Sequence, residues 1–279
     1  MTRFNENLPL PRTMLVAALL AGLGGCAVTP SAQQVKEKAR QEAAERASAG
    51  ADRELTEAEK AAAGTVLIYA EKEAGAPGFT TRIFVNAKYM QISDTRSPAD
   101  YVLFDRDQRT IYNVTADDKT IFVIKPKPVT AQPPFELSFE AESQPSSAIP
   151  KIDGRQATHY RFYANGEHCY DSVAIGGDFM ADVLAAMRDF RLVLAGEHAT
   201  TVHNTPPELQ DACDLSLNVF HSTAYMDKGL PIREWDRHGY QRFLKDYRIG
   251  VSVEGGVIEL PKDYRRYSVG DVLIQHGAK

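Results

Sequence analysis

The fold is decided by six short segments between residues 65 and 124: TVLIY (65–69), TTRIFV (80–85), YMQI (89–92), YVLF (101–104), TIYNV (110–114) and TIFVI (120–124). β-Branched and aromatic residues dominate these segments, which is typical of strands. The connectors are short, polar and rich in aspartate, as hairpin loops are. The pattern therefore predicts one curved antiparallel sheet that begins as a meander.

The strand pattern continues, with interruptions, towards the C-terminus. Asn165-Gly166 separates two further runs at the spacing of a hairpin. In addition to the meander, strands are predicted at 135–142, 157–163, 167–173, 231–235, 241–253 and 256–260.

Two amphipathic helices are predicted between these strands. Phe179, Val183 and Met187 recur at helical spacing within residues 178–194. Pro206-Pro207 opens a second helix to about Phe220, with Leu209, Cys213, Leu217 and Phe220 in register. We expect both helices to cover one face of the sheet, which makes the fold α+β.

The N-terminus predicts export. Residues 14–23, MLVAALLAGL, follow a weakly positive leader and match a secretory signal. The run is too short to span a bilayer, which needs about 20 apolar residues. It ends in Leu23-Gly24-Gly25-Cys26, which resembles the lipobox of bacterial lipoproteins, so we expect residues 1–25 to be removed and Cys26 to carry a lipid. An ordinary signal peptide with a chance cysteine nearby is the alternative.

The lipobox resemblance also implies an address. Ala27, rather than aspartate, follows Cys26, and in the lipoprotein families that this sequence resembles such a residue goes with sorting to the outer membrane. We therefore expect a lipid-anchored protein on the periplasmic side of the outer membrane of a Gram-negative bacterium. Its first partner is then the membrane itself, through the N-terminal lipid.

A spacer is predicted to separate this anchor from the domain. Residues 26–63 are rich in Ala, Glu, Lys, Arg and Gln, and between 31 and 63 only Val35 and Leu55 are large and apolar. Such a stretch buries little, so we expect a helical or disordered spacer, followed by a single domain at 64–279.

Charge excludes one class of partner. The chain has 32 Lys and Arg against 37 Asp and Glu, a net charge of −5. Loss of residues 1–25 would remove two arginines and one glutamate and make the mature charge −6. A mildly acidic chain of this kind does not predict nucleic-acid binding.

The strand motifs resemble one known superfamily. RIFVNAKYM (82–90), YVLFDRD (101–107) and KTIFV (119–123), with GLPIR (229–233) and VIELPKDY (257–264), are similar to the half-barrel superfamily of periplasmic lipoprotein carriers and receptors of the Lol system (LolA/LolB-like). The resemblance covers about residues 64–267. It implies a strongly curved antiparallel half-barrel covered by two or three helices, whose concave apolar face holds acyl chains or a partner's hydrophobic segment. The long spacer and the helix pair at 178–220 depart from that pattern.

The cysteines predict a disulfide. Cys169 and Cys213 are the two thiols of the mature domain apart from Cys26, and exported proteins most often pair such cysteines. Two buried unpaired thiols are the alternative. His168 lies next to Cys169 on a strand, where neighbouring side chains point to opposite faces, so we do not expect the two to form a nucleophile and its base.

The remaining polar residues predict no reaction. The seven histidines lack metal-ligand spacing, and His198 and His203 are expected as solvated residues of the loop between the two helices. Asp105, Asp107 and the Asp117-Asp118 pair are expected to form turns. No phosphate-binding glycine loop, nucleophile elbow or zinc-protease motif occurs, so we expect neither catalytic residues, nor a metal, nor a cofactor.

Two functions follow as hypotheses. In the first, the half-barrel binds a hydrophobic ligand: an acyl chain, a lipoprotein or an apolar segment of a partner. In the second, the chain is a structural or envelope-assembly lipoprotein that acts on an envelope protein through its outer surface. A cavity of several hundred cubic ångströms between sheet and helices would favour the first, and a filled interior the second.

Overall fold

A computed structural model describes residues 63–147, 149–251 and 259–271. The chain divides into two compact units, Met1–Glu54 and Leu55–Lys279, and the description that follows concerns the second. The predicted signal peptide, Cys26 and nearly all of the predicted spacer lie outside the described residues. Within the described ranges, no helix is both long and apolar enough to cross a membrane.

The predicted meander is confirmed as the first half of a large open sheet. Each strand pairs antiparallel with the next, so strands that are consecutive in the sequence are also neighbours in the sheet. Its strands are β1 (Gly64–Lys72), β2 (Phe79–Val85), β3 (Tyr89–Asp94), β4 (Tyr101–Asp105), β5 (Thr110–Thr115) and β6 (Thr120–Ile124).

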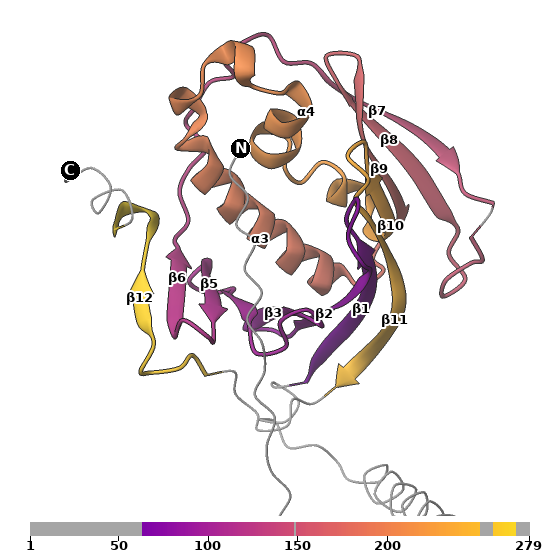
Figure 1. The fold of residues 1–279 in the computed structure, drawn as a ribbon. Coiled ribbons are helices and arrows are strands. Elements are labelled where there is room, and N and C mark those ends of the chain that lie inside the picture. Colours follow the sequence, from indigo (N-terminus) through magenta and orange to yellow (C-terminus); the bar gives the residue numbers. More distant parts are fainter. Residues whose placement is uncertain (1–62, 148, 252–258, 272–279) are drawn as a thin grey trace, which may run out of the picture. The chain divides into compact units, whose positions relative to one another are not determined.

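The second half of the sheet is built from later strands. These are β7 (Phe139–Pro145), β8 (Ala157–Ala164), β9 (Glu167–Ile175), β10 (Leu230–Asp236) and β11 (Gln241–Val251). β11 pairs antiparallel with β1 and joins the two halves, while β12 (Arg265–Tyr267) pairs parallel with β6. The result is one curved twelve-stranded sheet in the order β12-β6-β5-β4-β3-β2-β1-β11-β10-β9-β8-β7 (Figure 1).

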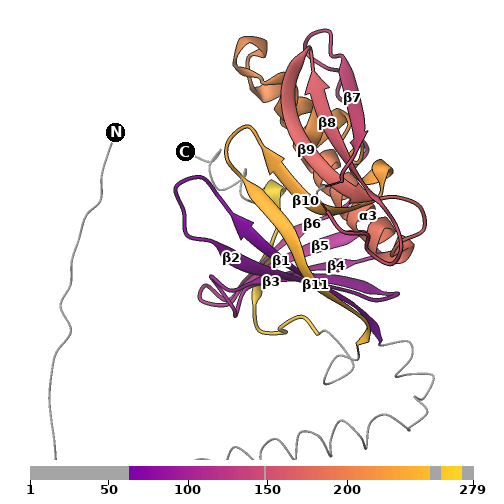
Figure 2. The ribbon, with the colours of Figure 1, turned by 90° about the vertical axis from the view of Figure 1, so that its right-hand side faces the viewer.

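One long helix, α3 (Ala181–Ala199), lies against the concave face of the sheet (Figures 1 and 2). It begins three residues after, and ends five residues after, the predicted 178–194. Phe190 of α3 meets Phe104 of β4 edge to face at 5.9 Å. Near its end, Gly196 allows the backbone of Lys127 to cross closely, since a Cβ there would lie 2.0 Å from the Lys127 carbonyl oxygen. Helix and sheet share one hydrophobic core.

The second predicted helix is wrong as a continuous element. The chain forms instead η1 (Val202–Asn204), η2 (Pro207–Leu209), α4 (Ala212–Leu215), the π-helical turn η3 (Ser216–Phe220) and η4 (Met226–Lys228). Gln210 and Asp211 are extended, and the Asp211 side chain caps α4 by accepting a hydrogen bond from the Asp214 backbone N–H at 2.8 Å. Leu209 is 73% exposed, so the prediction that it belongs to a buried apolar helix face is wrong.

Two strand predictions need correction, and one strand was not predicted. The strand predicted at 135–142 begins only at Phe139, as β7. Phe135 and Leu137 lie before it and pack against the helical segment around Val202 and Leu215. The strand predicted at 256–260 lies mostly outside the described residues, and Glu259 and Leu260 are not in a strand. β12 was not predicted, because it has only three residues, two of them arginine.

Candidate functional site

The main candidate site is a cavity of about 410 Å³ between the concave face of the sheet and the segment from α3 to η3. Its apolar lining comes from the sheet and from the helices that cover it. Its polar lining gathers around Arg237 and Arg242 on the β10–β11 hairpin. The apolar lining residues are Ile83, Met90, Ile92, Met187, Phe190, Leu217 and Met226.

A second cavity of about 440 Å³ adjoins the first on the concave face. Ile83, Ile92 and Arg242 line both cavities, so the two meet at these residues. No residue of α3 lines the second cavity, which is bounded by strands and their loops. We call the two cavities together the groove.

A buried ion pair lies where the cavities meet. Arg242 of β11 pairs through Nε with the carboxylate of Glu234 of β10, its cross-strand neighbour. Tyr170 donates a hydrogen bond to the other Glu234 oxygen at 2.8 Å, so both carboxylate oxygens have partners. Burial opposes the charge on Arg242, but Glu234 together with the surrounding tyrosines outweighs burial and holds the arginine pKa well above its usual value. The Glu234 side chain is fully buried.

Tyrosine hydroxyls surround this ion pair. Tyr69 lies beneath Arg242, with the guanidinium carbon 4.7 Å from the ring centroid, and donates to the Pro231 carbonyl oxygen at 2.8 Å. Burial, more than the nearby carboxylates, raises the pKa of Tyr170. Tyr170, which lines the first cavity, is consequently a neutral donor at physiological pH.

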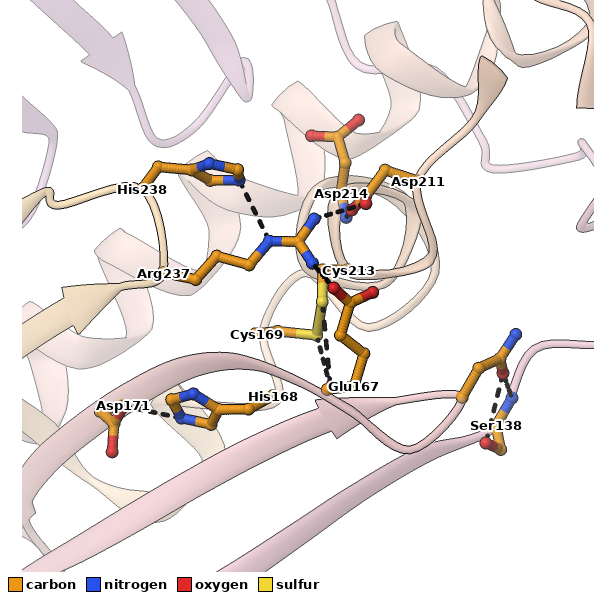
Figure 3. Close-up of a disulfide and its surroundings, with 11 residues drawn as sticks. Ser138, Glu167, His168, Cys169, Asp171, Asp211, Cys213, Asp214, Arg237 and His238 are labelled. Atoms are coloured by element: carbon orange, nitrogen blue, oxygen red, sulfur yellow. Dashed lines mark hydrogen bonds and ion pairs between the residues drawn. A yellow bond between two sulfur atoms is a disulfide. The ribbon is translucent and has the colours of Figure 1, made fainter. Parts of the chain in front are cut away.

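Arg237, in the β10–β11 turn, lines the first cavity and forms ion pairs there (Figure 3). Arg237 pairs through one Nη with Glu167, at the start of β9, and through the other with Asp211, which caps α4. Burial tends to raise the pKa of Asp211, but the Asp214 backbone N–H and Arg237 lower it overall. One guanidinium thus ties the hairpin, the sheet and the helical segment together.

Beside Arg237, the structure brings Cys169 and Cys213 to disulfide distance. Their Sγ atoms are 2.03 Å apart and their Cα atoms 5.3 Å apart (Figure 3). Phe162 pairs with Tyr170, and Tyr163 with His168, so Cys169 is the extra residue of a β-bulge. Both Cys169 and Tyr170 consequently line the first cavity.

His168 does not face the cysteine. Its Nε2 lies 2.8 Å from Asp171 Oδ2, outside hydrogen-bonding geometry, while His159 Nε2 is 2.6 Å from Asp171 Oδ1. Asp171 is 3% exposed, and the ring of Trp235 lies 5.1 Å from that of His159. In the part of the chain that the structure describes, no three His, Cys, Asp or Glu side chains are arranged to hold a metal ion.

Other expected positions are placed as follows. Cys26, the predicted site of lipid attachment, lies outside the described residues. His198 is in the last turn of α3 and not in a loop, because the helix extends further than its apolar pattern predicted, and His203 lies in η1. Asp105 accepts a hydrogen bond from the Gln108 backbone N–H at 2.9 Å, the turn-forming contact that was predicted.

Sequence reasoning missed the polar residues of the groove, although a signal for them exists. Glu71 follows Leu67 and Tyr69 at intervals of two, and Arg242 precedes Leu244 at the same interval. Alternate residues of a strand share a face, so both charges occupy the inward phase of their strands. A charge in the apolar phase of a strand indicates a polar site on the buried face.

Comparisons with known proteins give no family. No family model matches the chain, and no curated protein sequence matches it. An uncharacterised conserved protein from Thermus thermophilus aligns in structure with 82% of this chain and 99% of its own at 9% identity, with a TM-score of 0.39. PNGF-II, in its C2 crystal form, aligns with 77% of this chain at 9% identity and a TM-score of 0.36, and this chain spans about a third (32%) of its length. Scores below 0.5 do not establish a shared fold, and nothing about this chain is concluded from either protein.

Proposed function

We propose that this chain is a membrane-tethered, non-catalytic binding protein whose half-barrel holds the apolar chain of a ligand between β2, β3 and α3. One observation carries the proposal: a cavity of about 410 Å³ lies between the sheet and the helices, whereas a space filled by side chains would support the alternative function. Ligand pockets have volumes of about 300–1,000 Å³.

The lining of the cavity supports an apolar ligand. Ile83 and Met90 approach from the sheet, and Met187 and Phe190 from α3, so apolar side chains face each other across the cavity. Methionine side chains adapt readily to irregular ligand shapes. The adjoining second cavity extends this surface along the sheet, which suits an elongated ligand.

The proposal also includes a location for the protein. The lipobox-like Leu23-Gly24-Gly25-Cys26 supports anchoring on the periplasmic side of the outer membrane, with the spacer between lipid and domain. Metabolic labelling with a radioactive fatty acid tests this part. We expect label in the full chain and none in the Cys26→Ser variant; label in both would contradict attachment at Cys26.

The binding test uses the compact unit, residues 55–279, exported to a periplasm and purified. We expect native mass spectrometry to find co-purifying lipid, and the fluorescent apolar probe N-phenyl-1-naphthylamine to bind with micromolar affinity. Met187→Trp would place a larger side chain in the cavity and should weaken probe binding. Leu192→Trp is the matched control, because Leu192 lies on the same helix but is 43% exposed.

An apo mass together with no probe uptake would contradict the proposal. So would equal loss of binding in both tryptophan variants, because the effect would then not depend on the cavity. Circular dichroism would establish that each variant is folded, since overpacking of a core costs about 1–3 kcal/mol.

A further inference from the structure

We propose that the ligand is a lipid whose head group carries an ammonium group, with its chain in the first cavity and its cation in the second. This inference rests on the proposed function and names the ligand class of the same groove. It follows from an uneven distribution of charge along the groove.

The first cavity is formally neutral and the second is acidic. Arg191, Arg237 and Arg242 line the first together with three aspartates, so their charges balance. The second is lined by two arginines and by four carboxylates, a formal excess of two negative charges. The four carboxylates are Glu71, Glu73, Asp94 and Asp100.

Two of these carboxylates carry the excess. Arg96 is 3.0 Å from both Glu73 and Asp94, so those three groups form one ion-pair cluster. Glu71 accepts a hydrogen bond from the Tyr240 hydroxyl at 2.8 Å, and Asp100 accepts one from the Ala116 backbone N–H at 2.8 Å. Both donors are neutral, and within the described ranges neither carboxylate has a cationic partner.

Arg242 does not neutralise them. It is the direct cross-strand neighbour of Glu71 on one side and of Glu234 on the other, and its Nε pairs with Glu234. The three inward-facing charges Glu234, Arg242 and Glu71 thus sum to one negative charge. A fatty acid carboxylate placed here would meet repulsion, whereas an ammonium group would form charge-assisted hydrogen bonds.

The volume of the first cavity favours a lipid chain over a peptide. One turn of an α-helix about 10 Å across and 5.4 Å long fills on the order of 420 Å³. The first cavity, at about 410 Å³, would hold a single turn. A basic amphipathic helix presents its apolar face over several turns, so only one turn of it would lie in the first cavity.

The test compares three ligands with the same chain length: dodecylammonium, dodecanoate and uncharged dodecanol. Each displaces N-phenyl-1-naphthylamine from the 55–279 unit at low salt. We expect dodecylammonium to bind about tenfold more tightly than dodecanoate, since partly exposed charge pairs contribute modestly, and the difference to shrink at 0.5 M salt.

Variants locate the effect. Glu71→Gln combined with Asp100→Asn should reduce the preference for dodecylammonium over dodecanoate to near unity. Circular dichroism of this variant reports whether the domain is still folded. Glu208→Gln is the matched control, because Glu208 is an exposed acid of η2 that lines neither cavity.

Each other outcome is decisive. If dodecanol binds but dodecanoate binds as tightly as dodecylammonium, the ammonium inference is wrong and the proposed function stands. If a lysine-bearing amphipathic peptide displaces the probe and dodecylammonium does not, the ligand is a protein segment and not a lipid. If none of these ligands binds, the proposed function itself fails.

Discussion

Removing the Cys169–Cys213 link should destabilise the domain strongly. The two residues are 44 apart in sequence, and their Sγ atoms are 2.03 Å apart in the folded chain. For a loop of that length, the chain-entropy model gives a stabilisation of about 4 kcal/mol at 25 °C, because the crosslink restricts the unfolded chain. A domain of this size loses about 2–4 °C in Tm per kcal/mol, so we expect the Tm to fall by about 8–16 °C.

The assay compares the wild type, oxidised and reduced, with the Cys169→Ala, Cys213→Ala double variant. Urea unfolding followed by circular dichroism gives the free energy of unfolding, and calorimetry gives the Tm. Reduced wild type and double variant should unfold at nearly the same urea concentration, well below that of the oxidised protein. A thiol titration in denaturant without reductant should find no free thiol from this pair.

Two results would refute the reasoning. Reaction of both thiols in the unreduced, denatured protein would mean that the pair is not bonded. Equal unfolding free energies with and without reductant would mean that the loop-closure entropy is cancelled in the folded state. Arg237→Ala is a useful comparison, because it removes the neighbouring ion pairs and leaves the cysteines in place; we expect a smaller loss, since Arg237 pairs with partly exposed carboxylates.

Three further predictions concern single residues. Burial lowers the pKa of His221, whose ring stacks on that of Phe139 with the ring centroids 4.5 Å apart. The stability that is present above the unfolded-state pKa of about 6.5 should therefore be lost as the pH falls through the lower folded-state pKa. Urea midpoints between pH 7.5 and pH 5 should show this loss, and His221→Phe should flatten it. Gly229→Ala should cost about 1–3 kcal/mol in urea unfolding from backbone strain, because φ is +125°. A steric clash adds to this cost, since a Cβ would lie 2.2 Å from the carbonyl oxygen of Ile175 in β9, and an unchanged midpoint would contradict the prediction. Glu234→Gln should lower the free energy of unfolding by about 3–5 kcal/mol in the same measurement, because it leaves Arg242 buried without its carboxylate partner. A loss below about 1 kcal/mol would mean that water reaches the arginine.

The sequence predicted the sheet better than the helices, for a physical reason. Strands such as 101–104 and 110–114 are paired through short loops, so local pattern and turn residues suffice to define them. The segment 206–220 depends instead on the Asp211 cap and on packing against Phe135 and Leu137, which are far away in sequence. β12 is defined by its pairing with β6, which lies far away in the sequence, so no local sequence pattern predicts it.

The candidate site was predicted only in its outline. A hollow between sheet and helices was expected as one of two alternatives, and the pairing of Cys169 with Cys213 was expected, but not its place beside the cavity. The charged groups were not, because Glu234 and Arg242 come from two strands whose register is set by the β10–β11 pairing. The acidic second cavity depends in the same way on strand order, since Glu71 and Asp100 belong to separate strands and loops.

The pairing of β1 with β11 also sets a limit on how this chain folds. Gly64 lies opposite Val251, so a strand near the middle of the sheet acquires its second neighbour only from residues almost 190 positions later. Until that segment arrives, one side of β1 presents unpaired N–H and C=O groups, which are a template for association with other chains. Non-local pairing of this kind is slow. During synthesis, when the N-terminal half emerges first, this protein should therefore depend on chaperones that shield a strand edge.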